Sequence, residues 1–129
     1  MKALGARLLP LLSVGRMVLL FGELGAGKTT LVRGLLSAAG WEGAVRSPTF
    51  NLMQVYETDP PILHADLYRL KSAAGIGLED YLETHICLIE WPDRLDEVPE
   101  DVVVVRIDFD GEGRLVEVYG LSEPIPGAL

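Results

Sequence analysis

Apolar positions in the N-terminal part of the chain predict a helix, a buried strand and a second helix. Ala3 to Leu12 has apolar residues at helical spacing, and the segment from Pro10 to Gly15 ends that pattern. Met17 to Phe21 is a short, continuous apolar run, which is typical of a buried strand. Helical spacing resumes over Thr29 to Ala39 and stops at Gly40.

The middle of the chain predicts a hairpin, a short helix and another buried strand. Leu52 to Glu57 and Ile62 to Ala65 are predicted strands, and the prolines of the intervening TDPP mark a turn. We therefore expect these two strands to pair as an antiparallel hairpin. Gly77 to Glu83 has the pattern of a short amphipathic helix, and Ile86 to Ile89 is a fully apolar strand that ends on Glu90.

The last predicted elements are two strands that form a hairpin at the edge of the sheet. They are Val102 to Phe109 and Arg114 to Tyr119, and they flank the turn sequence DGEG. The chain has 129 residues, of which 49% are hydrophobic, and this is enough for one core built around a sheet. We expect residues 1–129 to form one α/β domain with no internal repeat or linker.

Charge and composition limit the classes of partner and compartment. Eleven basic against nineteen acidic residues give a net charge of −8, which opposes broad, unaided binding to a nucleic-acid backbone. The N-terminal apolar run resembles a signal peptide, but Pro10 and Arg16 interrupt it and a strand follows at once. No segment reaches the length of about 20 apolar residues that spans a bilayer. We expect a cytoplasmic protein that does not enter the membrane.

The cysteine content excludes a disulfide framework. Cys87 is the single cysteine, and it lies inside the apolar run ICLI. Because a cysteine in such a run is usually buried, we expect an inert thiol in the core.

The stretch GELGAGKTT matches the phosphate-loop pattern G-x-x-x-x-G-K-[ST]. A strand is predicted before it and a helix after it, which is the order that such a loop requires. Glycines let successive backbone N–H groups point at phosphates near the positive end of the helix, and Lys28 adds a full charge. A glycine-rich turn with an incidental lysine is the alternative. The residues that we expect to bind nucleotide here are Gly22, Glu23, Leu24, Gly25, Ala26, Gly27, Lys28, Thr29 and Thr30.

Two residues are candidate magnesium ligands. The Thr29 hydroxyl can reach a metal ion that bridges the outer phosphates, and Glu90 supplies a carboxylate at the end of an apolar strand. Asp108 is a rival, since Asp108 and Gly111 imitate the D-x-x-G element of GTPases. We favour Glu90, because Asp110 and Gly111 make a better hairpin turn and nothing resembles the guanine-reading N-K-x-D.

Asp66, in HADLYRL, follows an apolar strand that directs it toward the same crevice. It can position the attacking water or hold a magnesium-bound water. It can also cap the turn formed by LYRL, and the two roles are compatible. His64 lies two residues earlier and points to the same face as Asp66, and there we favour a packed, hydrogen-bonded histidine over a ligand.

Two further residues have both a functional and a structural interpretation. Thr49, in SPTF, lies where switch segments sense the γ-phosphate, although Ser-Pro can also simply turn the chain. Trp91, beside Glu90, is either an aromatic next to the nucleotide or a partner, or a half-buried structural residue.

The motifs GELGAGKTT, SPTF, HADLYRL and LIEWPDRL, in that order, resemble the TsaE family, the P-loop ATPase subunit of bacterial tRNA threonylcarbamoyladenosine synthesis. The resemblance covers roughly Gly15 to Arg94. It implies a three-layer P-loop NTPase fold, with a mixed, largely parallel sheet plus antiparallel hairpins.

The same resemblance implies an activity, cofactors and partners. It implies an ATPase that uses ATP and Mg²⁺ and acts with the TsaD and TsaB subunits, which would hold the tRNA and carry out the transfer. Turnover of ATP would reset or switch that complex. By position, Lys28, Thr49 and Asp66 would serve hydrolysis, Thr29 and Glu90 would bind the metal, and Trp91 matches an aromatic of the family.

Two other function classes share the phosphate loop. A small-molecule kinase would need an acceptor pocket and an arginine-rich lid, whereas the eight arginines here are scattered singly. A nucleotide-dependent interaction module would bind ATP without turning it over, and Asp66 and Glu90 argue against it.

Overall fold

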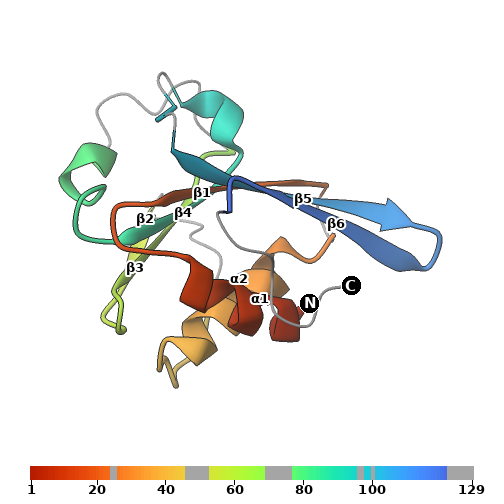
Figure 1. The fold of residues 1–129 in the computed structure, drawn as a ribbon, viewed down its shortest axis with the longest axis horizontal. Coiled ribbons are helices and arrows are strands. Elements are labelled where there is room, and N and C mark those ends of the chain that lie inside the picture. The colour runs from red at the N-terminus through yellow and green to blue at the C-terminus, as the bar shows by residue number, and fades with distance from the viewer. Residues whose placement is uncertain (24–25, 46–52, 69–76, 96–97, 100, 122–129) are drawn as a thin grey trace.

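A twisted β-sheet with two α-helices on one face forms the body of the molecule, as Figure 1 shows for a computed structural model of the chain. The structure describes residues 1–23, 26–45, 53–68, 77–95, 98–99 and 101–121. The described helices are α1 (Lys2–Leu8) and α2 (Lys28–Ala38), and the 3-10 turns are η1 (Leu9–Leu11), η2 (Leu78–Asp80) and η3 (Pro92–Arg94).

The described strands form a six-stranded sheet in the order β2-β3-β4-β1-β5-β6. Their bounds are β1 (Met17–Gly22), β2 (Met53–Tyr56), β3 (Ile62–Asp66), β4 (Ile86–Glu90), β5 (Val102–Asp110) and β6 (Gly113–Tyr119). β1 is parallel to β4 and β5, and β3 is parallel to β4. β2 and β6 are antiparallel to β3 and β5 at the two edges. The predicted mixed, largely parallel sheet with two antiparallel hairpins is confirmed.

The centre of the sheet, formed by β3, β4 and β1, is buried on both faces, as is usual for parallel strands with connections on each side, whereas most of β6 is exposed. One face packs against α1 and α2, and the other is covered by η2, η3 and their flanking residues (Figure 1). The helix-side core includes Val18, Leu20, Leu88, Val103 and Val105 from the sheet, with Leu8, Leu31, Val32, Leu35 and Leu36 from the helices. The opposite core includes Met17, Leu19, Leu63, Cys87 and Ile89, with Leu67 and Leu78.

Cys87 belongs to this second core, and its predicted burial is confirmed. Burial raises the pKa of the thiol to about 11, so the thiol is protonated at neutral pH.

Two predicted helices differ from the structure. The helix predicted over Ala3 to Leu12 is α-helical only as far as Leu8 and continues as η1, because Pro10 has no N–H to donate to the helix. The helix predicted over Gly77 to Glu83 was wrong: only the 3-10 turn η2 forms there, followed by further turns. A segment this short is below the length at which an α-helix is stable by itself, and the chain must turn at once into β4.

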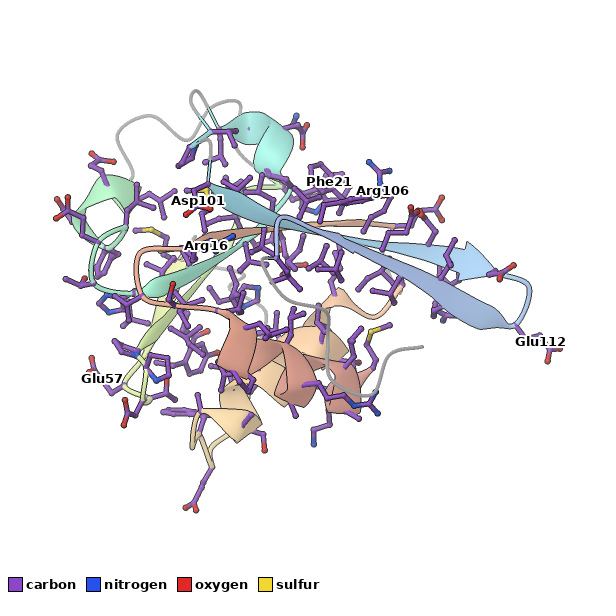
Figure 2. The ribbon with its side chains drawn as sticks, viewed as in Figure 1. Arg16, Phe21, Glu57, Asp101, Arg106 and Glu112 are labelled. Atoms are coloured by element: carbon purple, nitrogen blue, oxygen red, sulfur yellow. The ribbon has the colours of Figure 1, made fainter. Side chains whose placement is uncertain are left out.

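Figure 2 shows Arg16 and Asp101 near one another where β1 and β5 begin. The Arg16 Nη2 atom lies 3.3 Å from the Asp101 carboxylate and donates a 2.6 Å hydrogen bond to the Gly120 carbonyl oxygen. Arg16, just before β1, therefore contacts both the residue before β5 and the residue after β6. Asp101 is largely exposed, so the ion pair itself contributes little to stability.

The α1–α2 packing depends on two glycines that let the helices approach closely. A Cβ atom added at Gly5 would lie 2.5 Å from the Leu31 carbonyl oxygen, and one added at Gly34 would overlap the Lys2 carbonyl oxygen. Both obstacles are backbone atoms, which cannot rotate away as a side chain can. Any larger residue at Gly34 must therefore push α1 away from α2.

We expect Gly34→Ala to lower the free energy of unfolding by about 1–3 kcal/mol, since overpacking of a close contact costs about that amount. Urea denaturation measures the change. Ser37→Ala, at an exposed position of α2, is the control and should have a small effect. Alanine is a better helix former than glycine by about 1 kcal/mol, so an unchanged or raised stability of Gly34→Ala would mean that the two helices do not depend on this contact.

None of the described helices is long and apolar enough to cross a lipid bilayer.

Candidate functional site

Three parallel strands end side by side, and their last residues form the floor of the candidate site. Asp66 at the end of β3 pairs in register with Glu90 at the end of β4, and Glu90 pairs with Leu20 near the end of β1. Residues paired in register project to the same face of a sheet. Leu20 belongs to the core beneath α2, so Asp66 and Glu90 project to the α2 side. This is the crevice beyond the strand ends where α/β proteins bind ligands.

The phosphate loop connects β1 to the first turn of α2. Gly27 precedes α2 with φ of 117°, a left-handed conformation that residues with a Cβ rarely adopt. No side chain caps the N-terminus of α2, so its first backbone N–H groups are available to an anion. The Ala26 N–H donates a 3.1 Å hydrogen bond to the Glu23 carbonyl oxygen, which tightens the loop. Leu24 and Gly25, both predicted to bind nucleotide, lie outside the described residues.

Lys28, Glu90 and His64 form a buried cluster of polar side chains next to this loop. Lys28 and Glu90 are 6% and 5% exposed, and His64 is fully buried. The Lys28 Nζ atom lies 3.8 Å from Glu90 Oε1, and the His64 Nε2 atom lies 2.6 Å from Glu90 Oε2. Because an ionised carboxylate can only accept, Nε2 is the protonated nitrogen of His64 and donates to Glu90.

This arrangement compensates for the cost of burying the charges. A buried ion without a partner costs several kcal/mol, and the Glu90 carboxylate has a cation at one oxygen and a hydrogen-bond donor at the other. The predicted packed, hydrogen-bonded His64 is confirmed, and its acceptor is Glu90. The cluster holds the Glu90 carboxylate in one orientation at the mouth of the phosphate loop.

Trp91 and Tyr68 form an aromatic wall beside Lys28. The Lys28 Nζ atom lies 4.7 Å from the centroid of the Trp91 ring, a cation–π distance, and the Tyr68 and Trp91 ring centroids are 4.8 Å apart. Trp91 has φ of 59°, the one positive value among the described non-glycine residues. Such a backbone costs about 1–3 kcal/mol and clusters at functional sites, and here it places the half-buried ring against Lys28.

Asp66 is half-buried and accepts a 3.1 Å hydrogen bond from the Tyr68 N–H. The Asp66 side chain therefore holds a turn at Tyr68, while the rest of the LYRL turn that it was predicted to cap lies outside the described residues. Partial burial raises the pKa of Asp66, and the Glu90 charge raises it further, while the Tyr68 N–H, His64 and Lys28 lower it. A carboxylate with a raised pKa is the better proton acceptor.

The side chains and backbone N–H groups of this site suit the binding of ATP with Mg²⁺. Magnesium keeps several waters and usually takes one or two carboxylates plus phosphate oxygens, so it needs no dense ligand cage. Within the described part of the chain no group of three His, Cys, Asp or Glu side chains is arranged to hold a metal. Among the residues that the structure describes, the Thr29 hydroxyl has no hydrogen-bond partner. Thr29 directly follows Lys28 at the start of α2. Thr29 and Glu90 are the residues that would hold the ion.

The rival carboxylate lies on the other face of the sheet. Leu20 pairs in register with both Glu90 and Val105, so these three residues share a face. Asp108 comes three residues after Val105 on β5, which puts it on the opposite face. This placement favours Glu90 over Asp108. Thr49 lies outside the described residues, so its switch role stays a prediction.

Sequence reasoning missed two partners of the site. The contact of Tyr68 with Trp91 could have been anticipated from the sequence, because Tyr68 lies two residues after Asp66 in the same motif. The 3.1 Å hydrogen bond from Arg114 Nε to the Ala26 carbonyl oxygen could not have been anticipated, since 88 positions separate the two residues.

Comparison with known proteins agrees with this geometry. A family model described as "Threonylcarbamoyl adenosine biosynthesis protein TsaE" matches residues 1–116. The chain belongs to the TsaE family. Family membership places it among proteins of tRNA threonylcarbamoyladenosine biosynthesis.

Two TsaE proteins illustrate the similarity. The TsaE of Streptomyces coelicolor is 41% identical, with 95% of this chain and 92% of that protein covered. The TsaE of Haemophilus influenzae is 44% identical, with 79% and 68% covered. Among solved structures, the crystal structure of YdiB from Bacillus subtilis matches with a TM-score of 0.73 and 28% identity, covering 91% of this chain and 74% of that one. The P-loop NTPase fold expected from the TsaE resemblance is confirmed.

The role of His64 in orienting Glu90 makes a prediction. We expect His64→Gln, which can still donate to Glu90, to retain most of the Mg²⁺ affinity in the presence of ATP. We expect His64→Leu to weaken that affinity by about 10- to 100-fold, as is typical when the partner that orients a metal ligand is lost. Titration of Mg²⁺ against ATP-dependent Trp fluorescence measures both variants. If His64→Leu binds Mg²⁺ as the parent does, His64 serves packing alone.

Proposed function

We propose that this protein is a Mg²⁺-dependent ATPase required for threonylcarbamoyladenosine formation in tRNA, and that it uses ATP turnover to switch a TsaB–TsaD complex. The observation that carries the proposal is the buried contact between Lys28 and Glu90, directly beside the uncapped N-terminus of α2. A lysine, a carboxylate and free helix N–H groups at one point are what phosphoryl transfer requires.

Each residue has a distinct part in this proposal. The N–H groups of the loop and the Lys28 ammonium bind the phosphates, and Trp91 limits where the Lys28 side chain can move. Thr29 and Glu90 hold Mg²⁺, which when bound neutralises charge on the outer phosphates. Asp66 accepts a hydrogen bond from the attacking water and orients it, which its raised pKa favours. Thr49, outside the described residues, is the switch residue of this proposal.

Charge supports a division of labour between this subunit and its partners. A net charge of −8 opposes direct binding of tRNA, because affinity for nucleic acid comes largely from Lys and Arg on the phosphates. The tRNA is therefore held by TsaD and TsaB, and this subunit meets it only within the complex. ATP and Mg²⁺ are both supplied in the cytoplasm, where the complex works.

The test is the steady-state rate of Mg²⁺-dependent ATP hydrolysis by the purified protein, alone and with an added TsaB–TsaD pair. We expect slow hydrolysis alone and strong stimulation by the pair. A rate that the pair does not change would contradict coupling to that complex. Phosphate found on a small acceptor would identify a kinase, and tight ATP binding without any turnover would identify a binding module.

A further inference from the structure

The β5–β6 hairpin extends beyond the helices (Figure 1) and carries an arginine that reaches the phosphate loop. The Arg114 Nε atom donates a 3.1 Å hydrogen bond to the Ala26 carbonyl oxygen, and its Nη1 atom donates a 3.0 Å bond to the Gly113 carbonyl oxygen. Its guanidinium carbon lies 4.2 Å from the centroid of the Phe109 ring on the neighbouring strand. Two hydrogen bonds and a ring contact hold this side chain in one orientation.

A hydrogen bond that fixes the carbonyl of one residue also fixes the direction of the N–H of the next residue, because both belong to the same peptide plane. In a planar trans peptide the C=O and the following N–H point in opposite directions. The peptide between Ala26 and Gly27 is trans. With the Ala26 carbonyl bound by Arg114 on the hairpin side, the Gly27 N–H points away from the hairpin.

The remaining features of the loop agree with this orientation. Among the described residues, no backbone carbonyl accepts the Gly27 N–H, which leaves it available. Gly27 immediately precedes Lys28, whose ammonium is directed at Glu90 in the site. Gly27 has a left-handed φ that only glycine reaches at low cost, so the peptide can take this orientation because residue 27 has no Cβ.

We propose that Arg114 is a positioning residue of the phosphate loop, which fixes the Ala26–Gly27 peptide so that the Gly27 N–H faces a nucleotide phosphate. This inference rests on the proposed ATP binding, and it assigns to the β5–β6 hairpin a part in that binding. The hairpin, at an edge of the sheet, therefore contacts the loop at Ala26 through Arg114, in addition to the pairing of Ile107 with Gly22 at the start of the loop.

The chain offers a matched control on the same hairpin. Arg106 on β5 is also an exposed arginine next to an aromatic ring, with its guanidinium carbon 5.4 Å from the Phe21 ring centroid. Figure 2 shows both residues on the face of the sheet away from the helices. Arg106→Ala removes the same charge from the same hairpin without touching the phosphate loop.

The experiment measures Kd for the non-hydrolysable ATP analogue AMP-PNP with Mg²⁺, and KM and kcat for ATP. For Arg114→Ala we expect Kd and KM to rise about tenfold, the scale of one lost charge-assisted hydrogen bond, with kcat at saturating ATP within about twofold. Arg114→Lys, which keeps one donor, should recover part of the affinity. Arg106→Ala should bind as the parent protein does.

A second readout does not depend on nucleotide. We expect the Gly27 amide resonance, in NMR spectra of ¹⁵N-labelled protein without ATP, to shift in Arg114→Ala and to stay unchanged in Arg106→Ala. If the parent protein binds no nucleotide, the proposed ATPase fails while this resonance still tests the peptide orientation.

The inference is overturned if Arg114→Ala leaves both Kd and the Gly27 resonance unchanged. It is also overturned if Arg106→Ala weakens binding equally, since that result would reveal a general effect of charge. Should Arg114→Ala fail to fold by circular dichroism, Arg114→Met decides the question by the same two readouts, because it keeps a long side chain but has no hydrogen-bond donor.

Discussion

Replacement of Lys28 by alanine is expected to weaken ATP binding at least tenfold. The Lys28 ammonium is 6% exposed and lies at the start of α2, where nucleotide phosphates meet the helix N-terminus. A hydrogen bond to a charged group contributes about 1.5–3 kcal/mol, and 1.4 kcal/mol corresponds to a factor of ten in Kd. Isothermal titration calorimetry with ATP and Mg²⁺ measures the change.

Two further variants separate charge from packing. Lys28→Met keeps a long apolar side chain and removes the ammonium that lies over the Trp91 ring, so it should lose as much affinity as Lys28→Ala. Lys2→Ala removes an exposed lysine from α1 and should bind ATP normally. A Kd for Lys28→Ala equal to that of the parent protein would show that this loop is not the phosphate site.

Glu90→Gln is expected to abolish Mg²⁺-dependent hydrolysis while leaving the Kd for ATP within a few-fold. An amide fills the same space and can still accept from His64, but it no longer offers a charged ligand to the metal. Loss of charge stabilisation that acts mainly in the transition state lowers kcat by about a hundredfold or more. A phosphate-release assay at saturating ATP measures kcat.

Glu90→Gln is preferred to Glu90→Ala for a reason visible in the site. Both variants remove the counter-charge of Lys28, but alanine would also leave a cavity and take away the acceptor of His64, so it would cost more stability than glutamine. Asp108→Asn is the matched control, since this carboxylate lies on the opposite face of the sheet. Loss of hydrolysis in Asp108→Asn with normal turnover in Glu90→Gln would identify Asp108 as the metal ligand.

Much of the fold was predictable because the apolar pattern follows local periodicity. Met17 to Phe21 and Ile86 to Ile89 were predicted as buried strands, and both lie in the centre of the sheet, covered on each face. The DGEG turn predicted the β5–β6 hairpin with bounds within one residue. The helix predicted over Gly77 to Glu83 was wrong because the amphipathic pattern of this segment fits an α-helix and a series of tight turns equally well.

The candidate site was predictable where its residues share a local motif. The phosphate loop and the Glu90 carboxylate are recognised by what immediately precedes and follows them, and the structure brings Lys28 and Glu90 within 3.8 Å of each other. Asp66 was predicted to lie near them, and register places it directly beside Glu90. The switch role of Thr49 stays a prediction.

The sequence by itself determined the strand–loop–helix unit, the acidic residues at the carboxyl ends of the apolar strands, and the family. Each of these can be recognised from residues that are neighbours in the chain. Only the tertiary structure decided which partners these residues have. The Glu90 carboxylate is shared between Lys28 and His64, and Arg114 binds the Ala26 carbonyl, because strand order and register join positions far apart in the chain. No local pattern encodes that order, since it depends on how all the strands and helices pack together.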